Sequence, residues 1–427
     1  MILEKYDNYK DSGVEWLGDI PEGWDVKRVK DVSFVVLGKM LDNVKQENNF
    51  LKPYLKSKNI TWQNVNLSSV EEMYFSSYEL KKYKLKYSDL LLSEGGEVGK
   101  TSVWKDELDE CYIQNSVHKI TINANNDYRY FYYISLSLGK RGYYDSIVNI
   151  VSIKHLTREK LICCFWLRPP TKQLQTKIAN FLDKKTSQID SKIKLLKEKI
   201  TSYKELKKSL INETVCRWLN KNVELKDSNV EWVGKIPKEW NVDRGKNLFY
   251  ELEKSKIPAK EGLKKGEYKF FTSSKNQTKW INQANQKIKD IIFSTGGTAG
   301  VHYCDELHEY STDCWALSSN KISLKYYYYY YLSILFEIHK LAFKGTGINH
   351  LQKDFIKLGS IPNPIKQQQT AIAKYLDKKT SKIDSIITKL KNQVTTLTEF
   401  RKTLINDIVT GKIKVPEWTN YTYKINF

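Results

Sequence analysis

The sequence predicts a duplicated α/β (α+β) fold, in which a pair of long antiparallel coiled-coil helices separates two globular domains related by a pseudo-twofold axis. Three patterns predict this fold, and each occurs twice in the same order. They are a segment with spaced tryptophans, a glycine-rich loop after an apolar run, and a long heptad stretch. The chain has 427 residues, which is enough for two or three domains.

The first short repeat occupies residues 11–30, "DSGVEWLGDIPEGWDVKRVK", and returns at 227–246 as "DSNVEWVGKIPKEWNVDRGK". Trp16 and Trp24 correspond to Trp232 and Trp240 (232 − 16 = 216 and 240 − 24 = 216). An isoleucine and a proline before a tryptophan predict an extended segment whose aromatic rings are buried. We expect these segments to hold each domain to the helix pair.

Each globular segment mixes strand and helix patterns, so each is predicted to be a compact α/β unit. "SDLLLSEGGEVGK" at 88–100 matches "KDIIFSTGGTAGV" at 289–301, which indicates a strand that enters a glycine-rich loop. An aromatic helix follows in each half. The apolar run "LICCFWL" around Cys163 and Cys164 is predicted to be a buried strand, and the stretch from Tyr326 onward an amphipathic helix.

The long repeat lies within 173–215 and 367–409, where apolar residues recur in steps of three, four and seven. Counterparts lie 194 positions apart (376 − 182 = 194), and both copies carry a long cation, Lys207 and Arg401, at one seam position. This seam predicts two supercoiled helices, each about 65 Å long at about 1.5 Å per residue, which cover each other. The expected seam residues are Leu182, Ile189, Ile193, Leu196, Ile200, Leu210, Leu376, Ile383, Ile387, Leu390, Val394, Leu397 and Leu404.

An antiparallel pair is favoured because the chain that leaves the first helix then starts the second half without running back about 60 Å. The alternative is two unrelated amphipathic helices, each packed on its own domain. The predicted division of the chain is an anchor at 1–24, a domain at 25–170, a helix at 171–218, a linker at 219–240, a domain at 241–365, a helix at 366–410 and a tail at 411–427.

Composition indicates a polyanionic partner, because the formal net charge is +21 and the sequence pI is near 9.3. The six cysteines show no metal-ligand spacing, so we expect reduced thiols in a cytoplasmic protein. Neither a secretion signal nor a membrane span is predicted. The sequence predicts no membrane partner.

Catalytic chemistry is not predicted. "EGGEVGKT" at 94–101 resembles a phosphate-binding loop, but Glu94 occupies the position of its first glycine. The six histidines form no metal pattern, and neither a nucleophile elbow nor an S-adenosylmethionine motif is present in the sequence. We therefore expect no catalytic residues, no metal and no cofactor on this chain.

The duplicated order resembles the specificity subunit of type I restriction-modification enzymes. The residues that carry the resemblance are "EWLGDIPEGW" and "EWVGKIPKEW", "PPTKQLQTKIANFLDKKTSQID" and "NPIKQQQTAIAKYLDKKTSKID", and the loops "LSEGG" and "FSTGG". The resemblance implies two target-recognition domains, each reading half of a bipartite, asymmetric site in double-stranded DNA, with the helix pair setting the gap. It also implies two methyltransferase (modification) subunits and two restriction subunits as partners. S-adenosylmethionine, ATP and magnesium would then belong to those partners.

If the domains read DNA, lysines supply contacts to phosphates and polar side chains reach the base edges. The polar loops predict the contacting residues. In domain one they are Lys56, Ser57, Lys58, Asn59, Lys100, Asn149, Ser152, Lys154 and His155, and in domain two Ser273, Ser274, Lys275, Asn276, Lys344, Thr346, Asn349 and His350.

Three other interpretations remain. The chain could be a free-standing sequence-specific or architectural DNA-binding protein whose coiled coil is only a spacer. It could be an enzyme with an unrecognised active site. It could also bind RNA through its aromatic segments.

Overall fold

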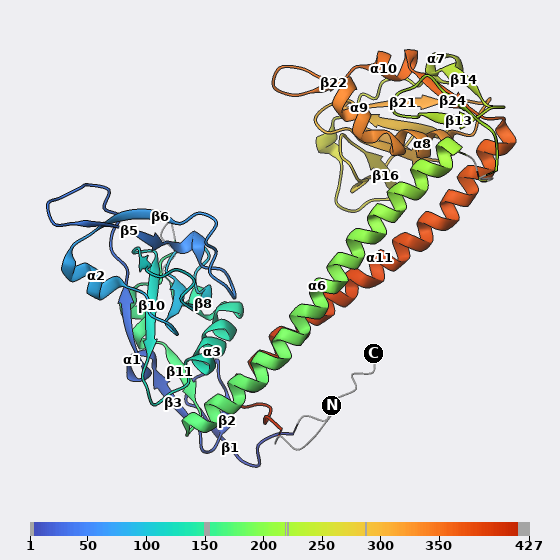
Figure 1. The fold of residues 1–427 in the computed structure, drawn as a ribbon. Coiled ribbons are helices and arrows are strands. Elements are labelled where there is room, and N and C mark those ends of the chain that lie inside the picture. Colours follow the sequence, from blue (N-terminus) through green and yellow to red (C-terminus); the bar gives the residue numbers. More distant parts are fainter. Residues whose placement is uncertain (1–3, 149–153, 218, 220–221, 287, 417–427) are drawn as a thin grey trace. The chain divides into compact units, whose positions relative to one another are not determined.

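The computed structural model describes residues 4–148, 154–217, 219, 222–286 and 288–416. It divides into two units, Met1–Leu195 with Gln393–Phe427, and Leu196–Asn392 (Figure 1). The division falls inside the two long helices, so each unit holds one globular domain and a part of each helix. The predicted fold class is confirmed: two mixed α/β domains with two long helices.

In unit 1 the domain is built on a four-stranded antiparallel sheet of order β4-β10-β7-β8. A three-stranded sheet of order β6-β5-β9 adjoins it, in which β5 and β9 are parallel. Two-stranded pairs β11-β3 and β1-β2 complete the unit. The strands are β1 Tyr9–Asp11, β2 Asp19–Pro21, β3 Asp25–Arg28, β4 Ser33–Leu37, β5 Phe50–Leu55, β6 Glu71–Phe75, β7 Leu90–Ser93, β8 Thr101–Val103, β9 Tyr112–Ile113, β10 Val117–Ile122 and β11 Phe165–Arg168.

Unit 2 repeats this topology and adds one hairpin. Its four-stranded sheet has the order β15-β21-β18-β19, and its three-stranded sheet, β17-β16-β20, again contains one parallel pair. The strands are β12 Leu225–Asp227, β13 Lys235–Pro237, β14 Asn241–Arg244, β15 Tyr250–Glu251, β16 Tyr268–Phe271, β17 Lys279–Ile281, β18 Asp290–Ser294, β19 Val301–Cys304, β20 His308–Tyr310, β21 Cys314–Ser318, β22 Phe343–Lys344, β23 His350–Leu351 and β24 Ser360–Asn363. The β22–β23 hairpin has no counterpart among the strands described in unit 1.

Short helices cover these sheets. In unit 1, α3 packs against β8 and β10, and in unit 2, α8 packs against β18 and β19. The helices are α1 Val29–Val32, α2 Ser77–Tyr83, α3 Tyr128–Lys140, α4 Tyr143–Ser146, α5 Arg158–Cys163, α7 Gly245–Leu248, α8 Leu324–Ser333, α9 Leu335–Ala342 and α10 Lys353–Leu358, with short 3-10 turns at Ser57–Asn59 and Ala259–Glu261.

Two segments differ from the structure that their sequence predicts. The run "LICCFWL" is not one strand: α5 ends at Cys163, the chain turns at Cys164, and only β11 is extended. Thr157 caps α5 by accepting a hydrogen bond from the Lys160 N–H. This cap favours the start of a helix, although the apolar run by itself predicts a strand. The stretch from Tyr326 is helical, but it breaks at Ile334 into α8 and α9. No helix of the described residues is long and apolar enough to span a membrane.

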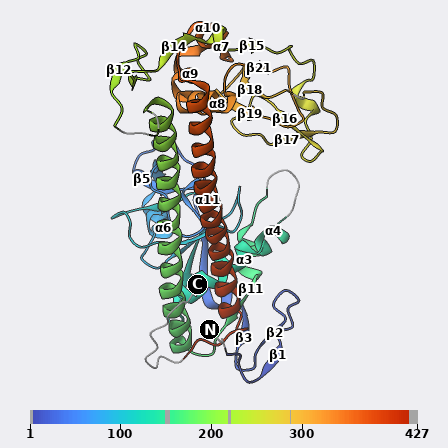
Figure 2. The ribbon, with the colours of Figure 1, turned by 90° about the vertical axis from the view of Figure 1, so that its right-hand side faces the viewer.

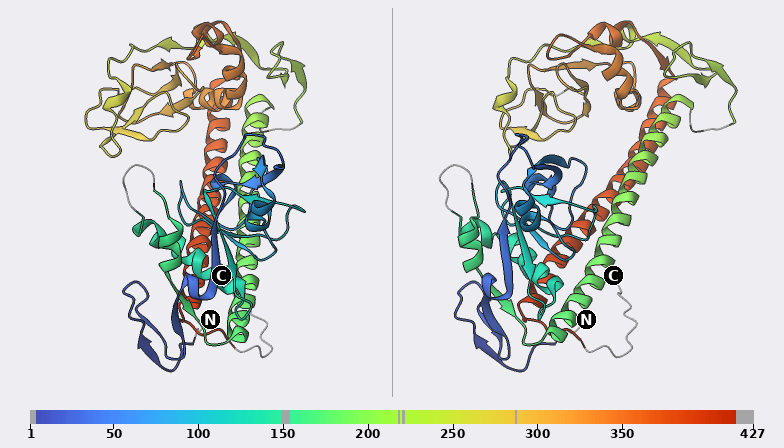
Figure 3. Two further views of the ribbon diagram at one scale, coloured as in Figure 1. Left: turned by 90° about the vertical axis from the view of Figure 1, so that its left-hand side faces the viewer. Right: turned by 60° about the vertical axis from the view of Figure 1, so that its left-hand side comes forward.

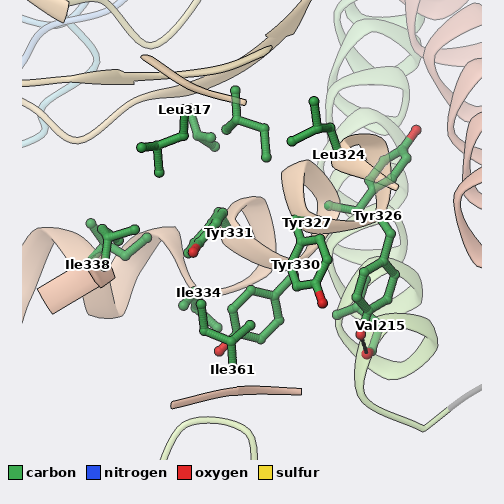
Figure 4. Close-up of a cluster of buried hydrophobic side chains, with 14 of the residues drawn as sticks. Val215, Leu317, Leu324, Tyr326, Tyr327, Tyr330, Tyr331, Ile334, Ile338 and Ile361 are labelled. Carbon is green, nitrogen blue, oxygen red and sulfur yellow. Dashed lines mark hydrogen bonds between the residues drawn. The ribbon is translucent and has the colours of Figure 1, made fainter. Parts of the chain in front are cut away.

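The tyrosines of α8 are buried in the core of unit 2, apart from Tyr328, which is half-buried (Figure 4). Tyr326 lies edge-on to Tyr327, and Trp240 of the repeated tryptophan segment packs against Tyr326. In unit 1, Trp24 packs in the same way against Tyr130 of α3. The tryptophan segments therefore anchor each aromatic helix.

The long helices are α6 Lys172–Arg217, of 46 residues, and α11 Lys366–Val409, of 44 residues. They lie side by side (Figure 2). The predicted seam residues are buried, apart from Ile193, Leu196, Leu210 and Val394, which are half-buried. Their outward faces are mostly polar, as two helices that cover each other require, but Leu195, Leu206 and Phe400 are exposed there.

A buried glutamine begins each long helix in the same way. The Gln175 side chain accepts a hydrogen bond from the Asp127 N–H and donates to the Pro169 carbonyl, at 2.9 and 3.2 Å. Its counterpart Gln369 (175 + 194 = 369) accepts from the Ser323 N–H and donates to the Pro364 carbonyl, both at 2.7 Å. The side chain thus joins the start of each long helix to the start of its aromatic helix.

The helices are antiparallel within each unit. In unit 1, Tyr133 of α3 donates to Asp183 near the start of α6, while Tyr130 donates to the carbonyl of Val409 at the end of α11. In unit 2, Tyr329 of α8 donates to Asp377 near the start of α11, and Tyr326 donates to the carbonyl of Val215 near the end of α6. Each aromatic helix therefore meets the beginning of one long helix and the end of the other.

The β1–β2 hairpin lies beside the end of α11 in unit 1 (Figure 3). The Tyr9 hydroxyl donates to the Gly411 carbonyl at 3.0 Å. Gly411 has a φ of +71°, and a Cβ there would come within 2.5 Å of Pro21, so this turn requires glycine. The packing of the anchor segment depends on that close approach.

Candidate nucleic-acid interface

Three segments far apart in the sequence meet at the glycine-rich loop of domain one, which joins β7 to β8. Gly95 forms an antiparallel bridge with His155, and the Leu156 N–H donates to the Glu94 carbonyl at 2.8 Å. The Ser57 hydroxyl donates to the Gly95 carbonyl, also at 2.8 Å. The loop of Lys56–Asn59, the glycine loop and the His155 segment therefore form one surface.

Domain two brings the matching segments together. Gly296 bridges to His350, and the Gly297 N–H donates to the Asn349 carbonyl at 3.0 Å. The Gly296 N–H donates to the Ser273 hydroxyl at 3.4 Å. We call each of these surfaces a loop junction, defined by Ser57, Gly95 and His155 in domain one and by Ser273, Gly296 and His350 in domain two.

The predicted lysines of domain one are all paired with carboxylates. Lys56 and Lys58 both bind Glu71, at 2.6 and 2.8 Å, and hydrogen bonds from these two lysines and from Tyr54 hold the pKa of Glu71 at about 2. Lys100 binds Glu97 at 2.8 Å, and Lys154 binds Asp145 at 3.2 Å. A DNA phosphate would compete with these carboxylates for the lysines.

The other predicted residues of domain one differ in how accessible they are. Asn59 is 1% exposed, and its amide donates to the carbonyls of Asn66 and Ser69, so it shapes the loop instead of facing a ligand. His155 is exposed on one side, and its Nδ1 lies 2.9 Å from the carboxylate of Glu94. Asn149 and Ser152 lie outside the described residues.

The predicted residues of domain two are more open. Ser273 and Ser274 are half-buried, and their hydroxyls donate to the carbonyls of Asp313 and Asn276. Lys275 and Asn276 are exposed, as are Lys344, Thr346, Asn349 and His350 on the β22–β23 hairpin. Among the ion pairs of the described residues, none involves Lys275 or Lys344. Domain two therefore presents uncompensated positive charge where domain one presents ion pairs.

The loop that resembles a phosphate-binding motif is unsuited to that ligand. Glu94 turns its carboxylate toward His155, and Lys100 is held by Glu97. An anionic ligand would meet both carboxylates, which disfavours a bound nucleotide. Within the described part of the chain no cluster of histidine, cysteine or acidic residues is placed to hold a metal ion, and the cysteines are free thiols.

Sequence reasoning missed two functional candidates at these surfaces. Glu71 pairs with two of the predicted lysines, but it lies 13 residues beyond Lys58 (71 − 58 = 13) and no local pattern links them. Ile348 is 66% exposed at the tip of the β22–β23 hairpin. Its position between glycine and asparagine in "KGTGINH" was the signal that a turn would expose it.

Comparison with known proteins agrees with this architecture. The profile of the family described as "Type I restriction modification DNA specificity domain" matches residues 21–202 and 237–396. A candidate MjaX specificity subunit of a type I restriction enzyme, from Methanocaldococcus jannaschii, is 22% identical and covers 96% of this chain and 98% of its own length.

Solved structures share the fold. A chain from work on complex assembly and conformational transition of the type I R-M system has a TM-score of 0.70 at 13% identity, and covers 91% of this chain and 98% of its own. The HsdS subunit from Thermoanaerobacter tengcongensis has a TM-score of 0.51 at 13% identity, and covers 92% and 98%. Since the family profile matches most of both halves, this chain belongs to the family of type I restriction-modification DNA specificity domains, and it contains two of them.

Proposed function

We propose that this chain is the non-catalytic subunit that confers DNA sequence specificity on a type I restriction-modification complex. Each globular domain reads one half of a bipartite, asymmetric site in double-stranded DNA, and α6 and α11 set the gap between the halves. The observation that carries this proposal is the duplicated loop junction. The same three segments converge in both domains and present serine, histidine and nearby lysine side chains.

Charge supports DNA as the ligand. The formal net charge of +21 supplies a sequence-independent attraction to phosphates, which makes binding strongly dependent on salt. Specific reading requires side chains that reach the base edges, and the polar residues of the two loop junctions are suited to the major groove. The candidate contacts are those predicted from the sequence, with Asn59 assigned to loop structure instead.

Methylation and cleavage then belong to partner subunits, which bind S-adenosylmethionine, ATP and magnesium. We propose that two methyltransferase subunits dock on the helix pair and that two restriction subunits complete the complex. Leu206 and Phe400 support this docking site: they are repeat counterparts (206 + 194 = 400), and both are exposed, at 53% and 49%. An apolar side chain exposed at the same place in both repeats is suited to two copies of one partner.

A domain exchange tests the division of labour. Residues 25–168 are replaced by the matching domain of a relative, and modified bases are mapped in a host that also expresses the methyltransferase subunits. We expect one half-site to change, while the other half-site and the gap stay as they were. The matched control replaces residues 241–365 and is expected to change the other half-site only.

The spacer role has its own test. One heptad is inserted into both α6 and α11, which keeps the seam in register. We expect a longer gap with both half-sites unchanged. If either the exchange or the insertion altered both half-sites, the proposal of separate readers on a spacer would be wrong. If the chain neither co-purified with a methyltransferase nor directed methylation, a free-standing DNA-binding protein would replace it.

A further inference from the structure

The β22–β23 hairpin of domain two is a short ribbon with an exposed tip. Phe343 and Leu351 are paired in register and are only 6% and 7% exposed, so the base of the hairpin is part of the core. Lys344 pairs with His350 above them, and every residue from 344 to 350 is exposed. The hairpin therefore projects polar side chains from a fixed base.

The tip is also held to the loop junction of domain two. The Leu351 N–H donates to the Thr295 carbonyl at 2.9 Å, and the Gly297 N–H donates to the Asn349 carbonyl at 3.0 Å. Gly345 and Gly347 have φ values of +157° and +92°, and a Cβ on Gly345 would lie 2.7 Å from the Ile348 carbonyl. The turn thus requires glycines and orients the residues that follow them.

Ile348 is the one exposed apolar side chain among residues 344–350 of this tip. It is 66% exposed, whereas the other exposed side chains there, Lys344, Thr346, Asn349 and His350, can all form hydrogen bonds. A two-stranded ribbon fits the major groove of B-DNA, and the C5-methyl group of thymine is the apolar group that a base pair presents there. Lys344, which has no ion pair in the described part of the chain, supplies the charge complementary to the DNA backbone.

We propose that Ile348 packs against a thymine methyl group in the half-site read by domain two and so specifies thymine at one position. This inference rests on the proposed function. The neighbouring Asn349 and His350 form hydrogen bonds with adjacent base edges, while the isoleucine contributes an apolar contact that excludes cytosine at its position.

Replacing single thymines by uracil tests the contact, because uracil lacks only the methyl group. The full chain, in complex with its methyltransferase subunits, is titrated with duplexes that contain the mapped site. Each thymine of the second half-site, on either strand, is replaced in turn. We expect one replacement to weaken binding about fourfold to tenfold, which is the contribution of one buried methyl group. The Ile348→Ala complex should bind both versions of that duplex equally.

The matched control is Leu358→Ala, an exposed leucine of the same domain, which should retain the wild-type response to uracil. Specific binding with no response to uracil at any position would overturn the inference and leave the proposed function standing. Equal responses in wild-type and Ile348→Ala would overturn it as well. A further measurement places 2-aminopurine in the second half-site. If its fluorescence rises only when Ile348 is present, while uracil has no effect, Ile348 is inserted between base pairs and the methyl contact is wrong. Failure to bind the mapped site specifically would overturn both proposals.

Discussion

The guanidinium group of Arg401 in α11 donates to both carboxylate oxygens of Asp190 in α6, at 2.9 and 3.1 Å. The repeat counterparts, Lys207 and Asp384 (207 + 194 = 401 and 190 + 194 = 384), form the matching ion pair at 2.6 Å. The same cross-helix contact therefore occurs in both units, with a two-point arginine contact in unit 1 and a single lysine contact in unit 2. The Arg401 side chain is also the more buried cation, with 13% exposed against 28% for Lys207.

This difference predicts unequal coupling across the helix pair. Arg401→Ala should cost about 1–2 kcal/mol of unfolding free energy, since two charge-assisted hydrogen bonds are lost from a partly buried site. Lys207→Ala should cost about 0.5 kcal/mol, because Asp384 is largely exposed and water screens the pair. Double-mutant cycles with Asp190→Asn and Asp384→Asn, measured by chemical denaturation, give the two coupling energies. Equal coupling energies would contradict the prediction.

The tyrosines of α8 predict two opposite effects of removing a hydroxyl group. Tyr326 is fully buried and donates to the Val215 carbonyl at 3.0 Å, so Tyr326→Phe leaves that carbonyl without its partner and should cost about 1–2 kcal/mol. Tyr331 is equally buried, but its hydroxyl has no hydrogen-bond partner among the described residues (Figure 4). Tyr331→Phe should therefore be neutral or stabilising. Thermal unfolding of both variants makes the comparison, and a larger loss for Tyr331→Phe would refute it.

A buried histidine predicts how the stability of unit 2 depends on pH. His308 lies 3.0 Å from the carboxylate of Asp290, and both side chains are fully buried. Burial is the largest single influence and opposes the charge of His308. The hydrogen bonds to Asp290, Cys304 and the Glu306 carbonyl, together with the charge of Asp290, outweigh it and raise the pKa of His308 to about 10. The folded state therefore keeps a proton that the unfolded state releases near pH 6.5.

The stabilisation that protonated His308 gives to the folded state is thus complete below pH 6.5, and it is lost as pH rises toward 10. Between pH 6.5 and 8.5 the unfolding free energy should fall by about 1.4 kcal/mol per pH unit more steeply in the wild-type protein than in His308→Gln. Denaturation at several pH values measures both slopes. Parallel slopes would mean that His308 is neutral in the folded protein.

Glu71 predicts a substitution that strengthens DNA binding. Glu71→Gln removes the carboxylate that holds Lys56 and Lys58, so both lysines become available to phosphates. Binding of non-specific DNA should tighten about threefold to tenfold at low salt, with a steeper dependence of affinity on salt concentration. Glu72→Gln is the matched control, because this neighbour is also exposed and the net charge changes equally. Identical salt slopes for the two variants would show that the lysines of domain one do not contact the backbone.

Sequence patterns predicted the duplicated order well, because heptads, tryptophan segments and glycine loops are local signals. They failed where a local cap overrode an apolar run, as at Thr157 and α5. They also placed Asn59 among the reading residues, since an asparagine that closes its own loop has the same sequence signature as one that faces a ligand. The division of the chain into domains at the predicted residues stays a prediction.

By itself, the sequence determined that this protein is built twice from one plan, with two long helices and a strongly positive charge. The tertiary structure alone decided which charges are neutralised, which loops converge, and that the hairpin tip of domain two is held beside its glycine-rich loop. These features depend on contacts such as that of Arg401 with Asp190, 211 residues apart along the chain, and no local pattern encodes a contact at that separation.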